Sequence, residues 1–135
     1  MKKLTLYLLT VIAVITFVIS PIATVVAYEL IFDKRYETEA WREFSVADFE
    51  GLEVERSDFE SAGTSLSGYK YKKNTQEIKG VLVIAHGMGG GGHNSFMPFI
   101  DYFTSNGYYV FTYDAQGNDN SEGTLEGLPT GVISK

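Results

Sequence analysis

The sequence of 135 residues contains no cysteine, only two histidines, and more acidic than basic side chains. Without cysteine there is no disulfide framework, thiol nucleophile or thiolate metal site. Beyond residue 27, 17 acidic side chains stand against nine basic ones, since Lys2 and Lys3 precede that point, so this part carries a net charge of −8. That charge argues against nucleic acid, whose phosphates require a basic surface. His86 and His93 lie seven residues apart with no carboxylate motif beside them, which makes a poor metal site. We expect no metal and no cofactor.

What the sequence does contain, first, is a long apolar run. Residues 4–27 include no charged side chain, and as a helix they would extend about 36 Å, enough to cross a hydrocarbon layer of roughly 30 Å. Because Lys2 and Lys3 precede the run, the positive-inside rule places the N-terminus in the cytoplasm and the remainder outside. We therefore expect residues 1–28 to be a membrane anchor, with the following domain on the extracellular side.

A cleaved signal peptide is the alternative. Residues 25–27, Val-Val-Ala, offer small side chains to a peptidase, and Ser20-Pro21 could end the apolar helix. Cleavable apolar regions, however, usually run about 7–15 residues, which is shorter than this one. Both readings carry the rest of the chain across the membrane.

The remaining sequence predicts a spacer followed by a domain of α/β class. In residues 29–50 the side chains of Tyr36, Ala40, Trp41 and Phe44 recur at helical spacing, which predicts an amphipathic juxtamembrane helix. From residue 51 the pattern predicts a β-hairpin, then a strand, a helix and a second strand. These elements are expected at 52–57, 66–71, 81–85, 94–105 and 108–113, with the hairpin turn at 61–63.

The strand–helix–strand unit implies parallel pairing with a right-handed crossover, and the hairpin before it makes the sheet mixed. The continuous apolar run at 81–85 is typical of a central strand buried on both faces. We expect Asn94 or Ser95 to cap the helix. We expect its apolar face to comprise Phe96, Phe99, Ile100 and Phe103, and Asn106-Gly107 to end it. The aromatic side chains at 108, 109, 111 and 113 are expected to pack on the sheet.

Two loops carry the strongest functional signal. The first strand of the unit runs into His86-Gly87 and a glycine cluster, and the second runs into a loop holding Asp114, Gly117, Ser121 and Gly123. These two segments resemble the α/β-hydrolase family, in particular bacterial esterases, lipases and serine aminopeptidases with a monoacylglycerol-lipase-like core. The resemblance covers residues 59–123. The sequence departs from the family pattern at Gln116, where Arg is common, and at Asp119, where Gly is common.

The resemblance implies an oxyanion hole. The backbone N–H of Met88 would supply half of it, with His86, Gly87 and Gly89 supporting the loop and the His86 ring bonded to nearby backbone. Acyl transfer builds negative charge on the carbonyl oxygen. Loss of one hydrogen-bond donor to this oxygen typically reduces transition-state stabilisation by roughly 3–4 kcal/mol. The expected substrate is a small acyl ester or a peptide-like acyl compound.

The rest of the catalytic machinery is not recognisable in this sequence. A Gly-x-Ser-x-Gly elbow is missing; residues 63–67 come nearest, but they lie in the early hairpin and end on Ser. We therefore expect an N-terminal fragment of a membrane-anchored serine hydrolase, inactive alone, with nucleophile, acid and base elsewhere. A second, C-terminal chain could complete the fold. In the resembled fold a fifth strand covers the 81–85 strand, so without it that strand would become an aggregation-prone edge.

Three polar side chains have simpler interpretations. We expect His93 to be a solvated loop residue, or else part of a substrate-entry rim. Asp114 is expected to bond the backbone of its own loop, and Ser121 to be a turn residue, not a nucleophile.

A dinucleotide-binding module is the rival interpretation. Residues 87–92 satisfy G-x-G-x-x-G between a strand and a helix, and Asp114 follows Gly92 by 22 residues at the end of the next strand. A hairpin before the fingerprint strand and a His before its first Gly count against this interpretation, and an exported domain would rarely meet NAD. A non-catalytic, membrane-anchored binding module is a further alternative.

Overall fold

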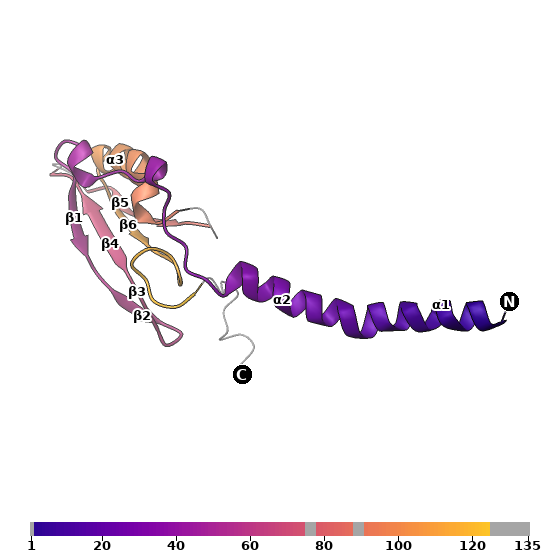
Figure 1. Cartoon of the computed structure of the whole chain (residues 1–135). Coiled ribbons are helices and arrows are strands. Elements are labelled where there is room, and N and C mark those ends of the chain that lie inside the picture. The colour runs from indigo at the N-terminus through magenta and orange to yellow at the C-terminus, as the bar shows by residue number, and fades with distance from the viewer. Residues whose placement is uncertain (1, 75–77, 88–90, 125–135) are drawn as a thin grey trace. The chain divides into compact units, whose positions relative to one another are not determined.

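A computed structural model describes residues 2–74, 78–87 and 91–124 (Figure 1). The chain divides into two compact units, Met1–Asp33 and Lys34–Lys135. Within the described residues, the first unit is helical, and the second combines a mixed four-stranded β-sheet and a two-stranded ribbon with one α-helix and short 3₁₀ turns. The expected α/β class with a mixed sheet and an N-terminal apolar helix is therefore confirmed.

The first unit is one continuous helical run. It consists of α1 (Lys2–Val14), the π-helical turn η1 (Ile15–Ile19) and α2 (Ser20–Phe32). Pro21 lacks an N–H and its ring would collide with the carbonyl four residues back, and the wider π-helical turn directly before it relieves this conflict. Ser20-Pro21 therefore does not end the helix. Lys3–Phe32 spans 30 residues with a mean hydropathy of 2.5, long and apolar enough to cross a membrane or to act as a signal sequence.

The segment after this helix does not form the expected amphipathic helix. Between residues 33 and 50 the chain makes only two 3₁₀ turns, η2 (Ala40–Arg42) and η3 (Val46–Asp48). The prediction failed because Tyr36 is extended and pairs with Asn118, so its backbone groups bond another loop. The helical spacing of aromatic side chains was also misleading, since Trp41 is 77% exposed.

The second unit is built on a four-stranded sheet. Its strands are β1 (Glu53–Arg56), β4 (Gly68–Lys72), β5 (Gly80–Ala85) and β6 (Tyr108–Tyr113), in the spatial order β1-β4-β6-β5. β4 pairs antiparallel with β1 and with β6, whereas β5 pairs parallel with β6, from Gly80 opposite Tyr108 to Ala85 opposite Tyr113. The hairpin leading into a parallel strand–helix–strand unit is confirmed.

The hairpin continues beyond the sheet. β2 (Phe59–Ser61) and β3 (Thr64–Leu66) form a separate two-stranded ribbon that links β1 to β4. Its two turn residues, Ala62 and Gly63, have φ of 52° and 80°. Two successive left-handed residues make a type I′ turn, whose twist matches that of a two-residue hairpin.

The core lies between the sheet and α3 (Met97–Ser105), which follows the 3₁₀ turn η4 (His93–Phe96) (Figure 1). The buried core side chains come from β4, β6, α3 and the residue before β1: Leu52, Tyr69, Tyr71, Met97, Ile100 and Val110. Asn106 and Gly107, with φ of 89°, end α3 as expected.

The start of α3 and part of its buried face differ from expectation. Neither Asn94 nor Ser95 caps it, because these residues belong to the 3₁₀ turn and α3 begins only at Met97. Ile100 is buried and Phe96 and Phe103 pack against the core as expected, whereas Phe99 is 61% exposed. Met97 and Thr104 are also buried.

β5 is an edge strand, as expected without a fifth strand beside it, and not the doubly buried strand that its apolar run alone indicates. Among the described strands it pairs only with β6. Leu82 and Ile84 pack toward the core, but Val81 and Val83 point to the other face and are 68% and 62% exposed. With Tyr109 and Phe111 they line a groove of about 700 Å³ on that face.

This exposed strand predicts self-association. Expressed as residues 34–135, the second unit should aggregate, because an apolar edge strand offers free backbone groups to another chain. Replacing Val81 and Val83 with Thr and Lys should shift material to soluble monomer in sedimentation. Leu82→Lys is the matched control and should instead unfold the unit, since Leu82 packs against the core. A soluble wild-type monomer with a sharp cooperative melt would contradict the expectation.

Candidate functional site

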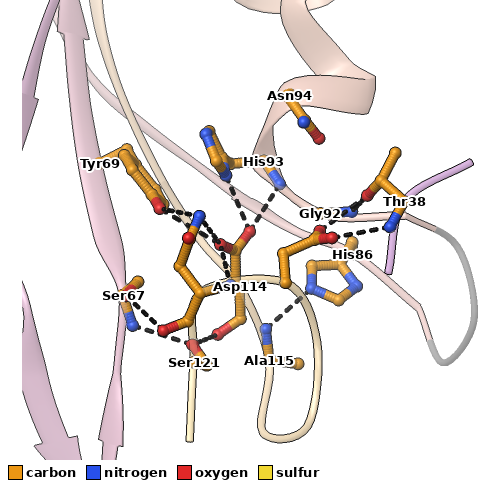
Figure 2. Close-up of polar contacts among 12 residues, drawn as sticks. Thr38, Ser67, Tyr69, His86, Gly92, His93, Asn94, Asp114, Ala115 and Ser121 are labelled. Carbon is orange, nitrogen blue, oxygen red and sulfur yellow. Dashed lines mark hydrogen bonds and ion pairs between the residues drawn. The ribbon is translucent and has the colours of Figure 1, made fainter. Parts of the chain in front are cut away.

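The candidate site lies where β5 and β6 end. Because the two strands are parallel, their carboxyl ends meet at one edge of the sheet, which is where ligands bind in open α/β sheets. The loop after β5 and the loop after β6 lie side by side there and are joined by hydrogen bonds between side chains and backbone (Figure 2).

His86 bridges the two loops through its ring. Its Nε2 accepts a 2.8 Å hydrogen bond from the N–H of Ala115, so Nδ1 carries the proton and donates to the carbonyl of Gly87 at 2.9 Å. Both ring nitrogens are therefore bonded to backbone. Met88 and Gly89, the other residues of the predicted oxyanion loop, lie outside the described residues.

Asp114 is the polar centre of the site. Its side chain is fully buried, and Oδ1 accepts hydrogen bonds from the N–H of His93 at 2.8 Å and from its Nδ1 at 2.9 Å. Oδ2 accepts longer bonds from the Tyr69 hydroxyl at 3.3 Å and from the backbone N–H of Asn120 at 3.4 Å. Burial by itself would raise the pKa of Asp114, but the hydrogen bonds from His93 outweigh it and hold the pKa of this carboxyl below its ordinary value.

His93 is not the solvated loop residue that the sequence predicted. Its side chain is only 13% exposed, and its ring stacks on Tyr69 with centroids 3.5 Å apart. The cause is the buried carboxylate of Asp114, which holds Nδ1 of the ring. Burial, and then the nearby Asp114 charge, raise the pKa of Tyr69 to about 12. The exposed edge of His93 borders a cavity of about 530 Å³, lined also by Glu43, Ser45 and other residues of 43–48 and α3.

Ser121 holds the loop after β6 in place. Its hydroxyl donates to the carbonyl of Asp114 at 2.5 Å and accepts from the N–H of Ser67 at 2.9 Å. Ser121 is 1% exposed, and its hydroxyl is engaged both as a hydrogen-bond donor and as an acceptor. Ser121 is thus a structural turn residue, as expected.

Two glycines of the loop after β5 have no room for a side chain. A Cβ on Gly92 would collide with the carboxylate of Asp119 and lie 2.6 Å from Oδ1 of Asp114. Gly91 has a φ of 84°, and a Cβ there would collide with Ser95. Gly91 and Gly92 therefore permit the close approach of the two loops.

Sequence reasoning missed the segment that covers this site. Arg35 and Thr38, treated as spacer, bind the loop after β6 and Gly92. Asp119 was the available signal, because it stands where the resembled family commonly has Gly. Among the described residues, no group of three or more Asp, Glu or His side chains is arranged to hold a metal ion.

Comparisons with known proteins give similarity at the level of structure only. No family model and no curated protein matches the sequence. A thioesterase domain from the curacin biosynthetic pathway aligns over 53% of this chain and 24% of its own, with 18% identity and a TM-score of 0.42. Acetyl xylan esterase 1 from Thermoanaerobacterium sp. aligns over 53% and 26%, with 18% identity and a TM-score of 0.37. An α-amino acid ester hydrolase aligns over 59% and 15%, with 12% identity and a TM-score of 0.39.

These neighbours are α/β-hydrolase-type enzymes. The chain spans between 15% and 26% of the length of each. Similarity this weak carries no inference about activity, which must rest on the geometry of the site.

Proposed function

We propose that this chain supplies the oxyanion side of a membrane-anchored serine hydrolase that cleaves a small ester or peptide-like acyl bond. The observation that carries the proposal is the His86 bridge, which ties the exit of β5 to the loop after β6. It fixes the backbone on the carboxyl side of His86, where a Met88 N–H would meet the developing oxyanion. Oxyanion stabilisation requires such donors to be fixed in advance.

The neighbouring contacts support the same role. Asp114 holds the N–H and ring of His93, so the glycine loop is fixed at its far end as well. Hydrogen bonds thus hold the residues on either side of this loop, His86 before it and His93 after it. The site lies at the carboxyl edge of parallel strands, the usual position of ligand sites in such sheets.

The acyl-enzyme chemistry needs a nucleophile, an acid and a base that we place on polypeptide outside these 135 residues. Ser121 is buried and engaged, and His86 has both ring nitrogens bonded to backbone. A nucleophilic Ser on an elbow would attack the acyl carbon, with its following N–H as the second donor. Residues 4–27 would anchor the enzyme, with the domain on the outer face, or serve as a cleaved signal.

A fluorophosphonate experiment tests this proposal. The 135-residue chain expressed alone should show no labelling. A tagged version expressed from the native locus with its flanking sequence should carry, or co-purify with, a fluorophosphonate-labelled serine outside these residues. Labelling of the isolated chain would overturn the proposal, and so would absence of label from the native-locus protein when a known serine hydrolase in the same lysate is labelled.

Dinucleotide binding is less compatible with the site. The acid of such a module must reach the ribose hydroxyls, but the Asp114 side chain is fully buried and both its oxygens accept internal hydrogen bonds. NAD titrated into the full chain in detergent micelles should show no saturable binding. Saturable binding would favour this rival over the hydrolase.

A further inference from the structure

Residues 35–38, which follow the apolar helix almost directly, bind across the loop after β6; we call this segment the strap. The guanidinium of Arg35 donates to three backbone carbonyls of that loop, those of Gly123, Asp119 and Ser121, at 2.9, 2.8 and 2.7 Å. Tyr36 adds two backbone bonds, one from its N–H to Gly117 and one from the N–H of Asp119 to its carbonyl.

Thr38 extends the strap to the glycine loop. Its N–H and its hydroxyl both donate to the Asp119 carboxylate, each at 2.7 Å. The same hydroxyl accepts the N–H of Gly92 at 2.7 Å (Figure 2). One hydroxyl therefore joins the strap, the loop after β6 and the loop after β5.

Asp119 explains why this contact exists here. Its φ is +36°, in the left-handed region that non-glycine residues rarely adopt. The resembled family commonly has Gly at this position, which would adopt that conformation without cost but could not bind Thr38. The carboxylate also occupies the space beside Gly92 that a Cβ would need.

We infer that Thr38 and Asp119 form a latch that positions Gly92, so that the placement of this residue depends on the strap being seated. Thr38 acts as a positioning residue through Asp119 and Gly92. A role of Thr38 in catalysis rests on the function proposed above, whereas its hydrogen bond with the Gly92 amide does not depend on that function. The latch makes the position of Gly92 conditional on a segment that lies three to six residues beyond the end of α2.

Amide hydrogen exchange on the full chain in detergent micelles tests the latch directly. Thr38→Val keeps the shape of the side chain but removes the acceptor, so the Gly92 amide should exchange roughly tenfold faster. Thr38→Ser should restore protection. Asp119→Gly should also accelerate Gly92 exchange, although it relieves the left-handed residue. Thr64→Val in the distant hairpin is the matched control, and the core amide of Val110 reports whether each variant remains folded.

Unchanged Gly92 exchange in Thr38→Val, with Val110 still protected, would overturn the latch, and so would failure of Thr38→Ser to restore protection. If the Val110 amide also loses protection in Thr38→Val, that variant is no longer folded. Gly92 exchange in Asp119→Gly, with Val110 still protected, then decides whether the latch exists. The role of the latch in catalysis is tested separately, by fluorophosphonate labelling of the native-locus protein. The Thr38→Val variant should be labelled roughly tenfold more slowly than the Thr38→Ser variant. If the wild type does not label, the proposed function fails while the exchange result still decides the latch.

Discussion

Asp114→Asn should lower the free energy of unfolding of the second unit by about 3 kcal/mol, the scale expected when one partner of a buried charged hydrogen-bond network is removed. The amide replaces an acceptor with an N–H₂ group that faces donors, because Asp114 accepts from His93, Tyr69 and Asn120. Chemical denaturation of the full chain in micelles, monitored by near-ultraviolet circular dichroism, would measure the loss. A change below 1 kcal/mol would contradict the assigned network.

The same substitution should change the pH dependence of stability. Because the folded-state pKa of Asp114 lies below its ordinary value, the folded state favours the ionised form. Its contribution is complete above the unfolded-state pKa and is lost as the pH falls through the lower folded-state pKa, so the loss occurs below about pH 4. In Asp114→Asn the stability should therefore fall less steeply with acid over this range.

Asp58 offers a matched control for the Asp114 experiment. Its hydrogen bond from Arg56 also holds its pKa below the ordinary value, but both side chains are largely exposed to solvent. Solvent screens such a pair. Asp58→Asn should therefore leave the midpoint of unfolding nearly unchanged, and a loss comparable to that of Asp114→Asn would show that burial is not the cause.

Gly92→Ala should produce the second large effect, a loss of about 2–3 kcal/mol from overpacking. The added Cβ would meet two carboxylates, those of Asp114 and Asp119, which are themselves fixed by hydrogen bonds and cannot move away without breaking them. The thermal midpoint of the second unit would fall accordingly, and exchange of the His93 amide would accelerate.

Gly87→Ala is the control within the same loop. No described atom beyond its chain neighbours lies within 4 Å of a Cβ at Gly87. This variant should unfold at nearly the wild-type temperature. Equal destabilisation by the two substitutions would mean that the glycine run is needed for backbone freedom in general and not for the packing against Asp114 and Asp119.

The sequence was sufficient for the hairpin and for the parallel strand–helix–strand unit because those depend on local signals. The alternation at 52–57 and 66–71, the Ala62-Gly63 turn and the helix between two apolar strands each specify their own geometry. The end of α3 at Asn106-Gly107 was predictable for the same reason. The apolar run of β5 alone indicated a strand buried on both faces, and its edge position was expected only from the missing fifth strand of the resembled fold.

The network of the candidate site depends on contacts between residues far apart in the sequence, which periodicity does not reveal. His93 looked like a solvated loop residue because its partner, Asp114, lies 21 residues away. The strap was interpreted as a helical spacer because its hydrogen-bond partners lie 54 residues downstream, at Gly92, or more than 80 residues downstream, in the loop after β6. The one local clue was Asp119, a non-glycine residue at a position that requires a left-handed backbone.

The most direct test of the account is the structure of the native-locus protein after reaction with a fluorophosphonate. The account predicts a phosphonylated serine from outside residues 1–135. It also predicts that the phosphonyl oxygen lies about 2.7–3.1 Å from the backbone nitrogen of Met88, the range of an oxyanion contact. A phosphonyl oxygen held by other donors, with the loop after His86 turned away from the adduct, would contradict the account.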